Sequence, residues 1–203
     1  LLAQLVRLKP DDRHNWLLYA NVLVSQGRPL EAIALLESAR SLDLLENDGL
    51  LVLGGLYQKG GFYREATATF LQLRQKSAKL SAECLLACAE SLTSDGKLAA
   101  AAEALAVIDF ELPPDDRVRL HLARAELFLA RHEDRQEKEQ LDAALALDPL
   151  NGKVLLALGR FHKAHDDMAR ADVALEAAAG QAEYAYRACI ELADIALKTR
   201  RYQ

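Results

Sequence analysis

The sequence predicts an all-α chain in which pairs of antiparallel helices stack one upon the next. Leu and Ala dominate the composition, whereas Pro and Gly fall at isolated points between helix-length apolar patterns. One pattern of small and large apolar residues returns every 34 to 36 residues. A helix pair of that length is too small to bury its apolar face alone, so successive pairs must pack on one another. The expected fold class is therefore an α-solenoid.

The clearest copy of the pattern is the stretch 50–73, which reads LLVLGGLYQKGGFYREATATFLQL. Gly54 on its first helix lets the second helix approach closely, and Ala66 and Phe70 on the second helix fill the space that this glycine leaves. The Gly60-Gly61 pair gives the backbone freedom that a tight turn between the helices needs. The stretch is thus expected to be a close-packed helical hairpin.

This stretch resembles one tetratricopeptide (TPR) repeat, whose 34-residue pattern is W-x2-L-G-x2-Y…A-x3-F. The matching positions are Leu50 in place of the Trp, Leu53, Gly54, Tyr57, Ala66 and Phe70. The resemblance implies a right-handed superhelix of helix pairs, in which the first helix of each pair, helix A, lines the concave side and the second is helix B.

Aligned on this repeat, residues 1–203 form a single expected array. Its expected segments are the tail of a truncated repeat (1–12), repeat 1 (13–46), repeat 2 (47–81), repeat 3 (82–117), repeat 4 (118–151), repeat 5 (152–185) and a truncated repeat 6 (186–203). The small contact residue of helix A is in turn Ala20, Gly54, Ala89, Ala125, Gly159 and Ala193, at intervals of 34, 35, 36, 34 and 34 residues.

The positions of the prolines along the chain agree with these segments. Pro10 ends the first amphipathic stretch, as expected for the close of a repeat that begins upstream, so the chain is expected to be a segment of a longer protein. Pro29 suits the first turn of helix B in repeat 1, and Pro113 closes repeat 3. In repeat 6, Cys189, Leu192, Ala193 and Ala196 are the expected packing residues, and Arg201-Tyr202 resembles the start of helix B.

Repeat 4 is the least regular. If Pro149 sets its register, Ala125, Phe128, Leu141 and Ala144 fall at packing positions, but three further positions that are normally apolar or small hold His121, Arg124 and Glu137. Either the register slips there or the packing changes. The charged run 131–139 is a candidate interaction patch, although a solvated turn and helix start with i,i+4 ion pairs is the favoured interpretation.

Composition excludes several classes of function. A net charge of -5 with interspersed signs lacks the basic stripe of a nucleic-acid-binding protein, and no apolar run reaches the length of a membrane span. Cys84, Cys88 and Cys189 have no metal or redox spacing, and Cys88 falls at a packing position. Without a phosphate-binding Gly-rich loop or a G-x-S-x-G motif, we expect no enzyme activity and no cofactor.

One cluster invites a metal-site interpretation. His162 and His165 lie near Asp166-Asp167, but His162 falls where Tyr57 packs in repeat 2, and the aspartates suit a turn with a helix N-cap. We therefore expect no metal site.

The TPR resemblance places a partner on helix A of each repeat, at the fifth, ninth and twelfth positions. The fifth position is apolar in all six repeats. The expected groove residues are Leu17, Asn21, Leu51, Gln58, Leu86, Glu90, Leu122, Glu126, Leu156, Arg160, Lys163, Ile190 and Asp194. The alternative is that the apolar residues pack between neighbouring helices. The Lys-Asn-Arg clamp of family members that bind acidic C-termini is absent, because Leu17 stands in place of the Lys.

These observations predict a non-catalytic scaffold that binds a helix or peptide of a partner protein, as one segment of a larger bacterial protein. Three alternatives stay open: a self-assembly module, a periplasmic scaffold of an envelope export machine such as exopolysaccharide secretion, and a substrate-presenting arm of an enzyme. The sequence leaves the choice between cytoplasm and periplasm open.

Overall fold

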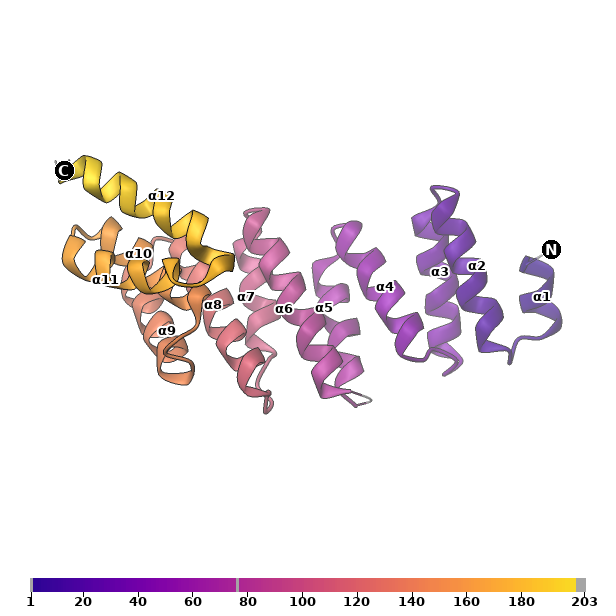
Figure 1. Ribbon diagram of the computed structural model, residues 1–203. Helices are drawn as coiled ribbons and strands as arrows, with labels where there is room; N and C mark the ends of the chain where they lie inside the picture. Colours follow the sequence, from indigo (N-terminus) through magenta and orange to yellow (C-terminus); the bar gives the residue numbers. More distant parts are fainter. Residues whose placement is uncertain (1, 76, 200–203) are drawn as a thin grey trace. The chain divides into compact units, whose positions relative to one another are not determined.

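The computed structural model describes residues 2–75 and 77–199, and within these ranges all regular structure is helical (Figure 1). The chain divides into two compact units, which are described separately. Unit 1 comprises Leu1–Leu92 and Ala99–Glu111, and unit 2 comprises Thr93–Leu98 and Leu112–Gln203. Of the helices in the described ranges, none has the length and apolarity needed to cross a bilayer.

Unit 1 is built from short antiparallel helices. They are α1 (Leu2–Leu8), α2 (Arg13–Ser25), α3 (Pro29–Ser41), α4 (Asn47–Lys59), α5 (Tyr63–Gln72), the 3-10 helix η1 (Leu73–Gln75), α6 (Ala78–Ser94) and α7 (Leu98–Ala106). The end of α6 and the start of α7 fall within Thr93–Leu98, which belongs to unit 2. Helix α2 packs on α3 and α4 packs on α5, as expected for helical hairpins.

The α4–α5 hairpin shows why a glycine is needed at the helix contact. A Cβ atom placed on Gly54 would lie 2.3 Å from Cε1 of Phe70. That distance is far inside van der Waals contact, so the glycine sets how closely the two helices approach. The packing expected between Gly54 and Phe70 is confirmed.

Unit 2 holds the helices expected for repeats 4 to 6. They are α8 (Pro114–Ala130), α9 (Asp134–Leu147), α10 (Gly152–Ala164), α11 (Met168–Ala179) and α12 (Ala182–Lys198). Helices α8 and α9 form one hairpin, α10 and α11 form the next, and α12 packs on both α10 and α11. Gly159 repeats the close contact of unit 1, because its Cβ would lie 2.5 Å from Cγ of Leu175.

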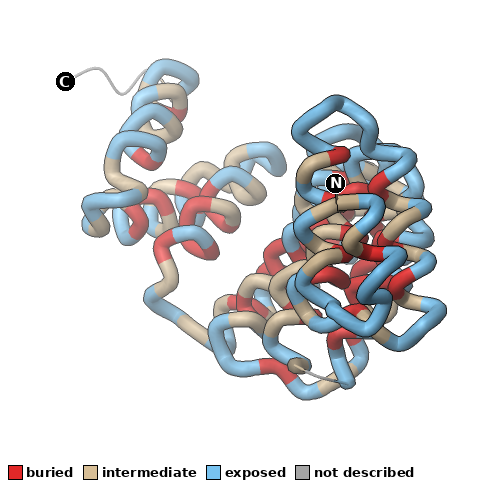
Figure 2. The backbone as a smooth tube through the Cα atoms, turned by 90° about the vertical axis from the view of Figure 1, so that its right-hand side faces the viewer, coloured by how far each residue is buried: buried red, intermediate tan, exposed pale blue. Residues whose placement is uncertain are grey.

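Along the helices, buried residues recur at helical spacing among exposed ones, so the buried residues of a helix lie on one face (Figure 2). In repeat 4 the buried stripe contains Ala125, Leu141 and Ala144, as the register set by Pro149 requires. Phe128, the remaining expected packing residue of this repeat, is only half-buried, and the chain buries an unusual residue, Glu137, in the stripe.

The last helix differs from expectation. Cys189 and Ala193 are exposed, whereas Ala188 and Ile195 are the buried residues of α12. The reason is that α12 packs against α10 and α11 with one face, and no described helix covers its opposite face. The expected start of helix B at Arg201-Tyr202 lies outside the described residues.

Candidate partner-binding pocket

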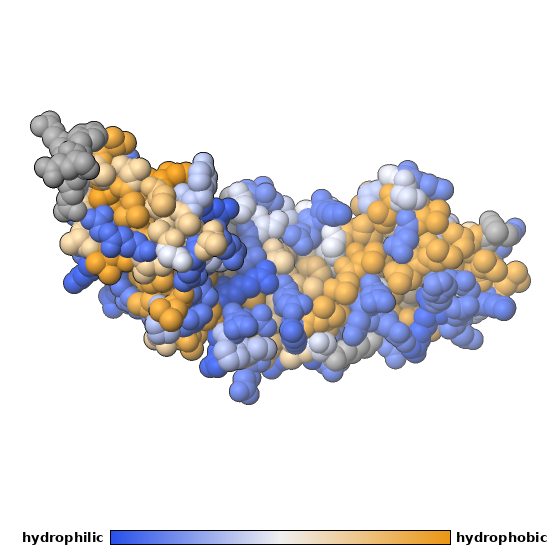
Figure 3. Space-filling view, viewed as in Figure 1, coloured by the Kyte–Doolittle hydropathy of each residue, from blue (hydrophilic) through white to orange (hydrophobic). Residues whose placement is uncertain are grey.

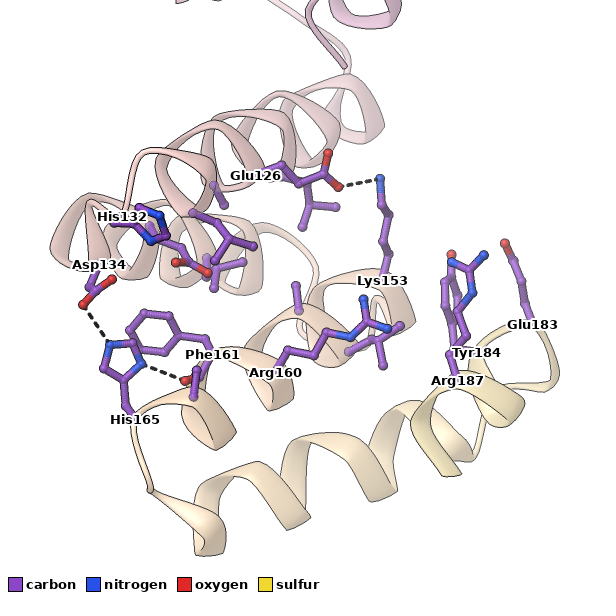
Figure 4. Close-up of a pocket in the computed structure, with 18 residues that line it drawn as sticks. Glu126, His132, Asp134, Lys153, Arg160, Phe161, His165, Glu183, Tyr184 and Arg187 are labelled. Atoms are coloured by element: carbon purple, nitrogen blue, oxygen red, sulfur yellow. Dashed lines mark hydrogen bonds and ion pairs between the residues drawn. The ribbon is translucent and has the colours of Figure 1, made fainter. Parts of the chain in front are cut away.

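Unit 2 contains a pocket of about 550 Å³ that is lined by side chains of α8, α9, α10 and α12 (Figure 4). Its apolar wall includes Leu122, Leu141, Leu156 and Phe161. These residues also belong to or pack against the two hydrophobic clusters of the unit, so the wall is held rigidly by the core behind it. Concave pockets are the usual form of a binding site, and this one combines the apolar wall with many charged and polar side chains.

Glu137 is the unusual residue of this pocket. It takes the position that Ala32, Ala66, Ala101 and Ala171 occupy in helix B of the other complete repeats. Each of those alanines is 0 % exposed and Glu137 is 5 % exposed, so an acidic residue is largely buried where the other repeats bury an alanine.

The Glu137 carboxylate lines the pocket, and no side-chain hydrogen bond or ion pair joins it to any described residue. Its burial in the apolar surroundings raises the pKa of the carboxyl above its usual value, the nearby Asp134 raises it further, and His165 lowers it. An unpaired polar group in such a position costs about 1–3 kcal/mol of stability, and a charged one costs more.

A second departure from the repeat pattern lies in the same pocket. The turn between the helices places Gly27, Gly61 and Gly96 at positive φ in repeats 1 to 3, and places His132 at φ 58° in repeat 4. Residues other than glycine adopt this left-handed region only at a cost in free energy. Asp166 holds the same turn position in repeat 5, but it does not line the pocket.

The end of the pocket that contains His132 and Asp134 is organised by His165 (Figure 4). Its Nδ1 donates to the carbonyl oxygen of Phe161 at 2.8 Å, and its Nε2 lies 3.2 Å from Oδ2 of Asp134. These two acceptors raise the pKa of His165, with the Phe161 carbonyl as the larger cause. The imidazole also stacks on the Phe161 ring, with centroids 4.2 Å apart. We call this the acidic end, because it holds two carboxylates, Asp134 and Glu137.

Basic side chains gather toward the other end. Lys153 pairs with Glu126 at 3.5 Å, and Arg160 pairs with Glu191 on α12 at 2.7 Å. Figure 4 shows Lys153 and Arg187 far from Asp134 and His165. Among the described residues, Arg187 has no ion-pair partner. This end of the pocket therefore holds both signs of charge, because Glu126 and Glu183 also line it.

The structure brings some of the expected groove residues together. Leu122, Glu126, Leu156 and Arg160 all line the pocket. Lys163 lies outside it, where it forms ion pairs with Glu191 and, at 2.9 Å, with Asp194.

The charges of Lys163, Glu191 and Asp194 thus neutralise one another between α10 and α12. Consistently, the pairing with Lys163 holds the pKa of Asp194 below its usual value.

The other expected groove residues do not gather at the pocket. Leu17, Leu51, Gln58 and Glu90 are half-buried, Asn21 and Ile190 are exposed, and Leu86 is fully buried. The fifth positions of repeats 3, 4 and 5 are buried, although Leu122 and Leu156 also line the pocket, so they do not form the continuous exposed apolar line that the sequence suggests.

Sequence reasoning missed most of the polar residues of the pocket. The run 131–139 was interpreted as solvated, and the pair of Arg135 with Glu139 at 3.0 Å fits that interpretation, but His132, Asp134 and Glu137 of the same run line the pocket. The available signal was that repeat 4 replaces both the turn glycine and the helix B alanine.

The cluster around His162 is a turn structure. Asp167 caps α11 by accepting from the backbone N–H of Arg170 at 3.2 Å, and its carboxylate lies 3.8 Å from Nδ1 of His162. In the described part of the chain, no three His, Cys, Asp or Glu side chains converge as metal ligands.

Unit 1 presents a different surface. Figure 3 shows hydrophobic residues gathered over its N-terminal helices on the face toward the viewer, with hydrophilic residues below them. Leu18 and Val24 of α2 and Leu30 of α3 are exposed apolar residues of this unit. This apolar surface is open, whereas the pocket of unit 2 is bounded by four helices, so the pocket is the stronger candidate.

Comparison with known proteins supports the fold. No protein-family model matches the sequence, and no curated protein matches it.

Among solved structures, PilF of Pseudomonas aeruginosa is similar with a TM-score of 0.55 and 15 % identity, over 95 % of this chain and 92 % of that one. MamA of Desulfovibrio magneticus RS-1 is similar with a TM-score of 0.54 and 17 % identity, over 82 % and 92 %. A thermophilic TPR protein of Thermus thermophilus is similar with a TM-score of 0.52 and 20 % identity, over 91 % and 99 %. The repeats of the sequence, the helical hairpins and these neighbours agree that the chain has the fold of the tetratricopeptide repeat proteins.

Proposed function

We propose that this protein is a non-catalytic scaffold that binds a helix or extended segment of a partner protein in the pocket of unit 2. The observation that carries the proposal is the position of the pocket. It is lined by α8, α10 and α12, the helix A elements that the TPR resemblance assigns to the partner-binding side, and also by the helix B element α9, and it includes four expected groove residues. The apolar lining residues supply contact area for such a segment, and the charged lining residues supply direction.

Site-specific photo-crosslinking tests this proposal. A benzophenone side chain replaces Leu129, which lines the pocket and is 56 % exposed, and in a control it replaces Val173 on α11, which is 70 % exposed and outside the pocket. In lysate of the source organism, the Leu129 variant is expected to capture one protein that the Val173 variant does not capture. Equal capture by both variants, or capture by the Val173 variant alone, contradicts the assignment of the pocket.

Self-association is the second candidate, and a specific feature of α12 favours it. Tyr186, Ile190 and Leu197 are exposed apolar residues that share one face of this helix with the exposed Ala193. A second copy of the chain could cover that face. Light scattering over a range of concentrations tests this: the native chain would gain mass with concentration, and an Ile190→Glu/Leu197→Glu variant would stay monomeric. A concentration-independent monomer mass for the native chain contradicts it.

A further inference from the structure

We infer that the pocket of unit 2 selects its partner by one cationic side chain, a lysine or an arginine, whose head group pairs with Glu137 at the acidic end. This inference rests on the proposed function, because it specifies which residue a bound segment must carry. In this inference, Glu137 recognises the positive charge of the partner's lysine or arginine.

The first support is the state of the Glu137 carboxylate itself. The residue is only 5 % exposed, it lines the pocket, and no described residue hydrogen-bonds or ion-pairs with its side chain. Buried carboxylates in folded proteins are normally paired, whereas the charge that acts on this one, His165, forms its ion pair with Asp134 and not with Glu137. The open pocket in front of it is where a counter-charge can be supplied.

The second support is the charge of the neighbouring groups. Asp134 is paired with His165, which leaves the Glu137 carboxylate as the unpaired acid of this end. The basic groups of the pocket do not compete for it: Lys153 pairs with Glu126, and Arg160 pairs with Glu191. Arg187 and Lys153 lie toward the opposite end (Figure 4). A metal ion does not fit, because the described residues offer no set of three ligands there.

The third support is the shape of the wall beside Glu137. Leu141 and Phe161 line the pocket with it, and they offer an apolar surface for the methylene stem of a lysine or an arginine. The Phe161 ring, which stacks on His165, keeps its place in this wall. A neutral apolar side chain would bury itself equally well on this wall but would leave the carboxylate unpaired.

The fourth support is that two of the departures of repeat 4 from the repeat pattern meet here, whereas the other two, His121 and Arg124, do not line the pocket. His132 occupies a turn position at φ 58° that three other repeats give to glycine, and Glu137 occupies a position that four other repeats give to alanine. Each change costs folding stability, and both side chains line the same pocket. Unfavourable residues concentrated at one cavity are the mark of a site that serves binding.

A peptide-display selection tests the inference. A library of random dodecamer peptides is selected against the native chain, a Glu137→Gln variant and a Glu139→Gln variant, each checked by circular dichroism to be folded. Glu139 lies on the same helix, is exposed and is paired with Arg135, so its variant makes the same change of charge outside the pocket. The native chain and Glu139→Gln are expected to enrich Lys or Arg at one peptide position, and Glu137→Gln is expected to lose that enrichment.

The best peptide is then synthesised with its Lys replaced by norleucine or its Arg replaced by citrulline. The native chain is expected to bind the neutral peptide at least tenfold more weakly, and Glu137→Gln is expected to bind both peptides within twofold, as measured by fluorescence anisotropy. Peptides selected without a basic position, or a basic position kept by Glu137→Gln, overturn the inference and leave the proposed function standing. If no peptide is enriched above background, the proposed function fails and this inference fails with it.

Discussion

The α4–α5 hairpin of unit 1 and the α8–α9 hairpin of unit 2 are both pairs of antiparallel helices, but they hold different side chains at corresponding positions. In α4–α5 the helix contact is Gly54 against Phe70, the turn is Gly61 at φ 80°, and the helix B position is Ala66. In α8–α9 the corresponding turn residue is His132 and the helix B residue is Glu137. The backbone positions correspond, so the difference lies in the side chains that they hold.

The comparison teaches that a repeat array can give up local stability at one repeat without losing its fold. Each repeat is supported by its neighbours, and α9 is held both by α8 and by α10. Such support lets one hairpin keep an unpaired carboxylate that an isolated hairpin could not tolerate. The following predictions test this difference between the two hairpins.

The largest effect is expected from moving the acidic residue into unit 1. Ala66→Glu places a carboxylate at a fully buried position of the α4–α5 hairpin, and we expect a loss of about 3 kcal/mol or more in the free energy of unfolding from overpacking and an unpaired charge. Chemical denaturation measures the loss. Ala68→Glu, at an exposed position of the same helix, is the control and should change stability by less than about 0.5 kcal/mol. Equal losses in both variants would mean that burial does not explain the effect.

The next effect concerns the close helix contacts that both units share. Gly54→Leu should cost about 1–3 kcal/mol or more, because even its Cβ would overlap the Phe70 ring. Gly55 has open space around it, so Gly55→Ala should stabilise the helix by about 0.5–1 kcal/mol. Thermal melts compare the two variants. Gly159→Leu should behave as Gly54→Leu does, and a variant that keeps the native melting temperature would refute the alignment of the repeats.

A smaller effect of opposite sign is expected at Glu137. Burial raises the pKa of its carboxyl in the folded chain above the value of about 4.3 in the unfolded chain, so the folded chain binds the proton more tightly. The free-energy penalty for ionising Glu137 in the folded chain is therefore absent below the pKa of the unfolded chain. It grows as the pH rises toward the pKa of the folded chain and is complete above that pKa. Glu137→Gln removes the ionisable group, so it should be more stable than the native chain by about 1 kcal/mol at neutral pH and nearly equal to it at pH 4. Urea unfolding at both pH values measures this, and an unchanged difference would contradict it.

The smallest effect is expected at the turn. His132→Gly relieves the left-handed strain and should raise the free energy of unfolding by about 0.5–1 kcal/mol. Asp166→Gly is the matched control at the same turn position in repeat 5, where the gain should be smaller because Asp tolerates this conformation better. Differential scanning calorimetry can resolve both. A loss of stability in His132→Gly would show that the histidine makes compensating contacts.

Much of the fold could be predicted because the repeat pattern is local and redundant. The small residue at each helix contact recurs at nearly constant intervals, and five of the six, from Ala20 to Gly159, are buried as expected. The sixth, Ala193, is exposed because the burial of a residue on α12 depends on which helix covers it.

Part of the candidate site could also be predicted. Leu122, Glu126, Leu156 and Arg160 come from groove positions of helix A, where spacing alone sets the helix face. The acidic end could not be found in this way, since it combines α9 with the turn at His132 and the end of α10.

By itself, the sequence determined that the chain is built of helical hairpins, which small residues lie at the helix contacts from Ala20 to Gly159, and that repeat 4 departs from the pattern at Glu137. Spacing along a helix is enough for these conclusions, because it decides which side chains share a face. Only the tertiary structure decided that Arg160 and Lys163 are paired with Glu191, and that Glu137 is buried without a partner at the end of a pocket. Pairing and burial depend on distances between helices that are far apart in the sequence, and no local pattern contains those distances.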